Sequence, residues 1–186
     1  MIEQGLLSTR QSAAYLLILC FVVFTVSGIL YTGRAIWQWP VGKTIGYLRW
    51  ERGFVLAAVV LTVLGLVLLE DLLRAAGDTV IAKLGLATYL LAAAVVMVAE
   101  ATFLNTRQFV YPQIIVYIVL AFLAQAAFGV SMLRTGLLAG WVGWATILWN
   151  LGWLVLLPLV SPRDLYYPVL HHTAPLLIGI MLLLKR

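Results

Sequence analysis

The chain has 186 residues, of which 64% are hydrophobic and only 10% are charged, and its formal net charge is +5. A soluble domain carries about 25% charged residues and about half apolar ones, so this composition excludes a water-soluble globule. The high hydrophobicity also excludes a disordered chain. The class that remains is an all-α polytopic integral membrane protein.

Six apolar runs predict six transmembrane helices that form one bundle, a single transmembrane domain. None of the runs alternates between apolar and polar residues, which favours helices over the strands of a membrane barrel. The first run is longer than the 7–15 residues typical of a signal-peptide core, so we expect it to be a true span. The predicted spans cover about residues 12–31, 45–69, 79–104, 113–133, 137–160 and 168–184.

The connections between these spans are short. We expect a polar, aromatic connection at about 33–44 and a tight turn over 70–78, in which Gly77 suits a helix C-cap and Asp78 an N-cap. A loop over 105–112, a turn at 134–136 and a last loop over 161–167 follow.

The orientation depends on how two arginines are assigned. With both termini on one side, Lys and Arg divide equally between the two sides; assigning Arg49 and Arg52 to the second span leaves an excess on the side of the termini. Because basic residues concentrate in cytoplasmic loops, we expect cytoplasmic N- and C-termini.

Ionisable residues inside spans are costly, which makes them candidates for function. The candidates are Arg49, Arg52, Glu100, His171 and His172, which the topology places toward one membrane side, opposite the termini. Arg52 and Glu100 enter adjacent antiparallel helices to similar depths, so we predict an ion pair between them. Glu51 is expected to point away from the face of Arg49 and Arg52, since i and i+3 share a helix face.

Two interpretations of this polar cluster remain open. In the first, Arg49, Arg52, Glu100 and one histidine line a pocket that binds a lipid headgroup, a small anionic ligand or a partner subunit, because arginine contacts phosphate or carboxylate at two points. In the second, one buried ion pair orients the helices, the other charges extend to the interface, and His171 and His172 lie at the interface.

Two amides and an aromatic stripe lie deeper in the predicted spans. Gln125 and Asn150 are expected either to form hydrogen bonds between helices or to line the pocket. A stripe on the fifth span is expected either to pack against a neighbouring helix or to stack a flat ligand. It comprises Trp144, Trp149 and Trp153.

We predict no cofactor and no metal. Adjacent helix residues point about 100° apart, so His171 and His172 cannot ligate one haem from both sides. A zinc site would need a third ligand, Glu100 or Asp164, and Cys20 is the only cysteine. No sequence pattern supplies a catalytic nucleophile, and no basic run indicates nucleic acid.

Three segments resemble small six-span bacterial membrane proteins of uncharacterised function, including those grouped as the DUF4386 family. The segments are 46–52, with Arg49 and Glu51; 134–144, a basic turn before a Gly- and Trp-rich span; and 175–186, the closing helix. The resemblance implies a six-helix architecture in a bacterial plasma membrane.

The function predicted from these observations is non-enzymatic binding of a lipid headgroup, a small anionic ligand or a partner subunit. Membrane lipids are the expected surroundings, and a homo-oligomer is a further expected assembly. One alternative is a small proton-coupled permease that uses Glu100, with a polar route past Gln125 and Asn150. The other is a lipid-modifying membrane enzyme that uses His171 or His172.

Overall fold

The computed structural model describes residues 8–108, 110–160 and 168–185, and within these ranges all regular structure is helical. Five of its α-helices are long and apolar enough to cross a membrane, whereas the last has 17 residues and is shorter. The predicted all-α membrane bundle is thus confirmed. The loop predicted over 161–167 lies outside the described residues. The helices are α1 (Thr9–Ala35), η1 (Pro40–Lys43), α2 (Ile45–Ala75), α3 (Ile81–Thr106), α4 (Tyr111–Thr135), α5 (Gly140–Val160) and α6 (Pro168–Leu184).

The second helix extends further than its apolar run predicts. Glu70, Asp71 and Arg74 belong to the last turns of α2 rather than to a turn, and Arg74 pairs with both carboxylates. The helix continues because Leu73 is fully buried and holds this segment against the core. It ends at Ala75 with Ala76 as its C-cap residue, and Gly77 follows with a φ of +105°, which suits glycine; the predicted cap thus lies one residue earlier, with Gly77 just beyond it.

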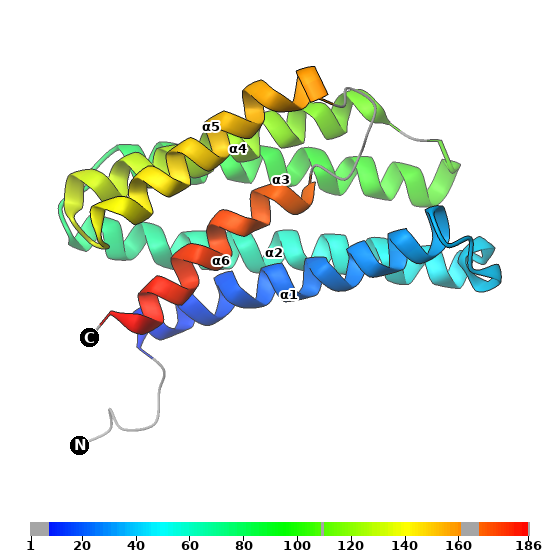
Figure 1. Ribbon diagram of the computed structural model, residues 1–186, viewed down its shortest axis with the longest axis horizontal. Helices are drawn as coiled ribbons and strands as arrows, with labels where there is room; N and C mark the ends of the chain where they lie inside the picture. The colour runs from blue at the N-terminus through cyan, green and yellow to red at the C-terminus, as the bar shows by residue number, and fades with distance from the viewer. Residues whose placement is uncertain (1–7, 109, 161–167, 186) are drawn as a thin grey trace.

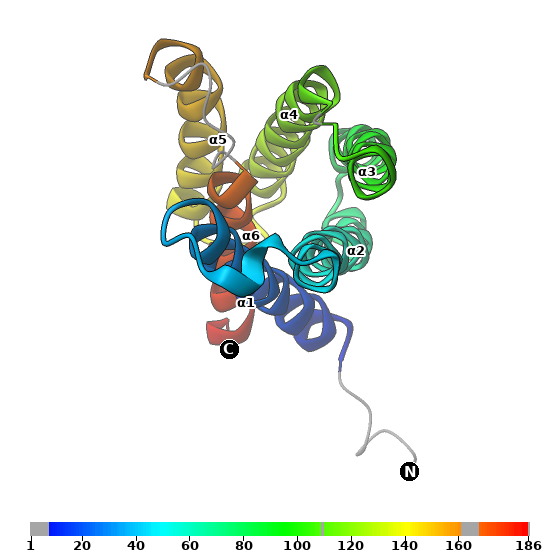
Figure 2. The ribbon, with the colours of Figure 1, turned by 90° about the vertical axis from the view of Figure 1, so that its right-hand side faces the viewer.

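The helices pack side by side along one long axis (Figure 1). Helix α1 begins and α6 ends at the same end of the bundle, which we call the terminal end; the opposite end, which holds η1, is the η1 end. Seen along the axis, α1 to α5 form an arc and α6 lies on its inner side (Figure 2). Helix α6 packs against α1, α4 and α5.

Glycines let two helix pairs approach closely. A Cβ atom on Gly179 of α6 would lie 2.8 Å from the Ala14 carbonyl oxygen of α1. A Cβ on Gly143 of α5 would lie 2.9 Å from the Gly129 carbonyl oxygen of α4. Real Cβ atoms do not come this close, so the backbones meet where only glycine fits.

Asp78 organises the turn between α2 and α3. Its carboxylate accepts hydrogen bonds from the backbone N–H groups of Val80, Ile81 and Ala82, at 2.9, 2.9 and 3.0 Å. Burial of Asp78 would raise its pKa, but the Ser131 hydroxyl and these three donors stabilise the anion and lower the pKa to about 2. Asp78 thus performs the capping role that its sequence position predicts, although α3 itself begins at Ile81.

Candidate functional site

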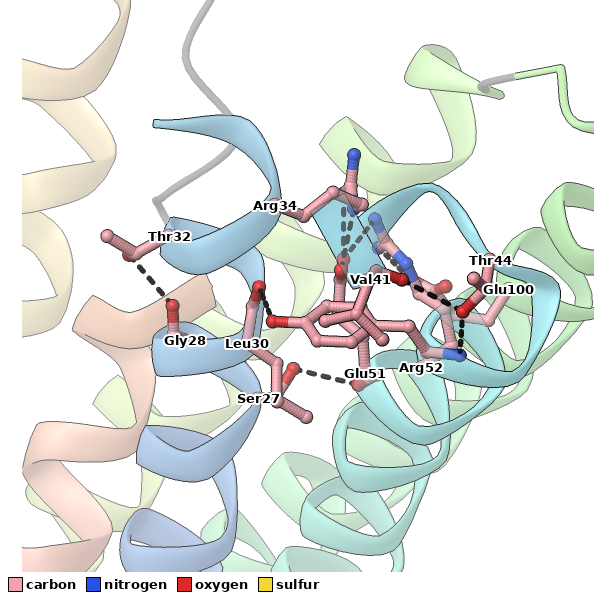
Figure 3. A network of polar contacts seen from close by, with 11 residues as sticks. Ser27, Gly28, Leu30, Thr32, Arg34, Val41, Thr44, Glu51, Arg52 and Glu100 are labelled. Carbon is pink, nitrogen blue, oxygen red and sulfur yellow. Dashed lines mark hydrogen bonds and ion pairs between the residues drawn. The ribbon is translucent and has the colours of Figure 1, made fainter. Parts of the chain in front are cut away.

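Four charged side chains meet at the η1 end and form what we call the charged network: Arg34, Glu51, Arg52 and Glu100 (Figure 3). Arg34, in the last turns of α1, donates from Nε and Nη2 to the two carboxylate oxygens of Glu51, at 2.7 and 2.8 Å. Arg52 lies 3.0 Å from Glu51 and donates from Nη1 to Glu100 Oε1 at 3.2 Å. The network joins α1, α2 and α3 with two positive and two negative charges.

The predicted Arg52–Glu100 ion pair is confirmed, but the predicted orientation of Glu51 is wrong. Glu51 does not point away from Arg52: it is 1% exposed and contacts both Arg52 and Arg34. Arg49 lies on the exposed side of α2 and outside the network. The physical reason is that the long Arg52 side chain reaches its sequence neighbour, while Glu51 faces α1.

Backbone contacts reinforce the join between α1 and α2. The Ser27 hydroxyl donates to the Glu51 carbonyl oxygen at 2.9 Å, and the Tyr47 hydroxyl donates to the Leu30 carbonyl oxygen at 2.8 Å. The Arg52 guanidinium also lies over the Phe103 ring, 4.6 Å from its centroid. Both arginines therefore already have carboxylate partners. This arrangement is typical of a structural network that holds neighbouring helices together.

The two histidines lie deep in the bundle, which favours the first of the two interpretations over an interfacial position. His171 and His172 are both 0% exposed. His172 packs on Phe24, 4.4 Å between ring centroids, and Phe24 lies about three turns before the end of α1. Helix α6 therefore begins well inside the bundle, short of the η1 end that α1, α2 and α3 reach (Figure 1).

Hydroxyl groups from three other helices surround the histidine rings. The Tyr117 hydroxyl of α4 lies 2.7 Å from His171 Nε2, and the Tyr89 hydroxyl of α3 lies 3.5 Å from the same atom. Thr62 Oγ1 of α2 lies 3.4 Å from His172 Nδ1. The histidine rings themselves are 4.1 Å apart at their centroids. Sequence reasoning missed these three residues; the two tyrosines at mid-span, away from their usual interfacial position, were the available signal.

Gln125 of α4 and Asn150 of α5 belong to the two helices whose neighbouring residues contact the start of α6. Gln125 lies one turn after Phe122, whose ring is edge-on to His171 at 6.3 Å between centroids. Asn150 follows Trp149, whose indole N–H donates to the Leu170 carbonyl oxygen at 2.7 Å. Both amides are buried, with exposed fractions of 1% for Gln125 and 0% for Asn150.

Close packing of α4 on α5 sets the two amides at the same level. A Cβ on Gly129 would lie 2.7 Å from Ile147 Cγ1, so these two residues face each other. Helices α4 and α5 run antiparallel. Gln125 lies one turn before Gly129 on α4, and Asn150 lies one turn after Ile147 on α5, so the two amides lie at a similar depth in the bundle. We call Gln125, Asn150, His171 and His172 the buried polar centre.

The buried polar centre carries polar atoms that lack hydrogen-bond partners within the described part of the chain. They are Gln125 Nε2 and Oε1, Asn150 Oδ1, His171 Nδ1 and His172 Nε2. Within the same described ranges, Asn150 Nδ2 donates to its own helix, to the Thr146 carbonyl oxygen at 2.7 Å. The interhelical hydrogen bonds predicted for the two amides are thus absent among the described residues, and each unpaired buried group costs about 1–3 kcal/mol.

The tryptophan stripe divides into two parts. Trp144 is 57% exposed on the outer side of α5. Trp149 and Trp153 form an edge-to-face pair with ring centroids 5.7 Å apart, and Trp149 hydrogen-bonds α6. The contact with α6 favours the packing interpretation for these two residues.

No known protein family, curated protein or solved structure matches the chain. The resemblance to small six-span bacterial membrane proteins therefore stays a prediction. In the described ranges, no group of three or more His, Cys, Asp or Glu side chains is placed to hold a metal ion.

Proposed function

We propose that the protein is a non-enzymatic integral membrane protein of a bacterial plasma membrane that binds a small ligand at the buried polar centre. We place six spans in the membrane, with α6 as the shortest, and both termini in the cytoplasm. Membrane lipids contact the outer aliphatic surface, and a second copy or a partner subunit is the further assembly we propose. The permease and the lipid-modifying enzyme stay predictions from the sequence.

The observation that carries the proposal is the set of buried, unpartnered polar atoms contributed by α4, α5 and α6. Polar groups inside proteins are almost always hydrogen-bonded, to the protein, to water or to a ligand. Five such atoms belong to four residues: two at the start of α6, and two on α4 and α5, the helices that contact it there. A bound molecule that forms hydrogen bonds with these atoms removes the free-energy cost of burying them unpaired in the hydrocarbon region.

The charged network supports ligand binding less well than the sequence indicates. Each arginine already contacts a carboxylate, and Glu51 takes two hydrogen bonds from Arg34. An anion bound there would have to displace a buried carboxylate from its partner, which costs more than it gains. We therefore place the ligand at the buried polar centre and assign the network to holding α1, α2 and α3 together.

Native mass spectrometry of the protein released from nanodiscs tests this proposal. We expect a discrete mass above that of the bare chain in the wild type and its loss in Gln125→Met, which keeps the side-chain volume but removes the amide. Thr88→Val is the matched control, because Thr88 is half-buried and, among the described residues, its hydroxyl bonds to the Leu84 carbonyl oxygen of its own helix. A bare wild-type chain, or a mass that Gln125→Met retains, would contradict the proposal.

A further inference from the structure

The hydrogen bonds around Thr62 favour one neutral tautomer of His172. The Thr62 hydroxyl donates its single hydrogen to the Ala58 carbonyl oxygen at 2.8 Å. Thr62 Oγ1 can then only accept from His172 Nδ1, 3.4 Å away, so Nδ1 carries the proton. A neutral imidazole has one N–H, and the unpartnered His172 Nε2 is therefore a hydrogen-bond acceptor.

The same reasoning makes His171 a donor. Two tyrosine hydroxyls, from Tyr117 at 2.7 Å and Tyr89 at 3.5 Å, approach His171 Nε2. A phenol is a stronger acid than a neutral imidazole N–H, so Tyr117 donates to Nε2 and the ring proton lies on Nδ1. The unpartnered His171 Nδ1 therefore presents an N–H group.

The described contacts of the histidine rings are uncharged. They come from Thr62, Tyr89, Tyr117, and the rings of Phe24 and Phe122. The arginines that could neutralise an anion are bound to Glu51 and Glu100. A charged molecule at the centre would lose its hydration without gaining a counter-charge, whereas an uncharged polar molecule would not.

From these assignments we infer that the ligand of the buried polar centre is a small uncharged molecule that both donates and accepts hydrogen bonds through hydroxyl or carboxamide groups. The Gln125 amide N–H groups and His171 Nδ1–H match the ligand's acceptors. His172 Nε2 and the amide oxygens of Gln125 and Asn150 match its donors. This inference rests on the proposed function, since it names the chemistry of the ligand at the same site.

Acetamide and acetate test the inference because they share size and shape and differ in charge. The protein in nanodiscs, labelled with ¹⁵N-histidine, is titrated with each compound while the ring nitrogen resonances are recorded. Before addition we expect unprotonated Nε2 on both rings. Acetamide should shift the His172 Nε2 resonance saturably and bind at least about tenfold more tightly than acetate. Gln125→Met should weaken acetamide binding by about tenfold or more, and Thr88→Val should leave it unchanged.

Several results would overturn the inference, and they separate it from the proposed function. Tighter binding of acetate, or a proton on His172 Nε2, contradicts the uncharged donor–acceptor ligand, even if native mass spectrometry still finds a bound molecule. The inference is also contradicted if the bound molecule proves to be an anion. The proposed function is contradicted as well if native mass spectrometry finds the wild-type chain with nothing bound and neither compound shifts the histidine resonances saturably. A Gln125→Met variant that unfolds is replaced by Asn150→Leu, for which the same weakening is expected.

Discussion

Replacing Arg52 with methionine is expected to lower the free energy of unfolding by about 3–5 kcal/mol. Arg52 is the cation that Glu51 and Glu100 share, and all three side chains are nearly inaccessible to solvent. Methionine fills similar volume but leaves the Glu100 carboxylate buried without a counter-charge. Reversible unfolding in mixed micelles, titrated with a denaturing detergent, measures the loss.

A double-mutant cycle separates the ion pair from a general packing defect. Glu100→Gln alone should cost about 1–3 kcal/mol, because the amide still accepts a hydrogen bond. The double variant, Arg52→Met with Glu100→Gln, should be clearly more stable than the sum of the single losses predicts. The exposed Arg49→Ala should change stability by less than about 0.5 kcal/mol. Additive losses would show that Arg52 and Glu100 are not energetically coupled.

Replacing Asp78 with alanine is expected to cost about 0.5–2 kcal/mol near neutral pH, because three backbone N–H groups at the start of α3 lose their acceptor. The effect depends on pH. The pKa of Asp78 is lowered to about 2 in the folded state from an ordinary value of 3.8, so its ionised form stabilises the fold above about pH 4. That contribution falls as the pH drops from about 4 toward 2.

Asp78→Asn is the matched variant for the pH dependence, because it keeps one acceptor oxygen and cannot ionise. The wild type should be more stable than Asp78→Asn at about pH 6, and the difference should shrink as the solution is acidified toward the folded-state pKa. Thermal unfolding of the two proteins at about pH 6 and at the acid end of this range measures the difference in stability. A difference that stays constant over this range would show that ionised Asp78 does not cap α3.

The helices could be predicted from the sequence because each rests on a long apolar run, and such runs need no knowledge of tertiary contacts. The Arg52–Glu100 pair could be predicted for a related reason, since depth along two adjacent antiparallel helices is readable from residue numbers. The role of Arg34 could not be predicted from the sequence. It lies at the end of α1, where a basic residue is an ordinary feature of a span boundary, and only the packing of α1 on α2 brings it to Glu51.

The surroundings of the histidines could not be predicted, because the sequence does not show how deep in the bundle the last helix begins. Helix α6 starts inside the bundle, so His171 and His172 meet Tyr89, Tyr117 and Thr62 instead of the interface. Those three residues come from three helices, and no local pattern links them. Gln125 and Asn150 were identified as deep polar residues, but only their lack of partners gives them a place in the proposed site.

The claim that a ligand occupies the buried polar centre can be tested with a crystal structure of the wild-type protein grown in a lipidic mesophase. We expect electron density that does not belong to the chain within hydrogen-bond distance of the Gln125 amide and of His172 Nε2. Density that fits an uncharged hydroxyl or carboxamide compound would also identify the ligand. A Gln125 amide bonded to the protein itself, with nothing bound beside His172, would contradict the claim.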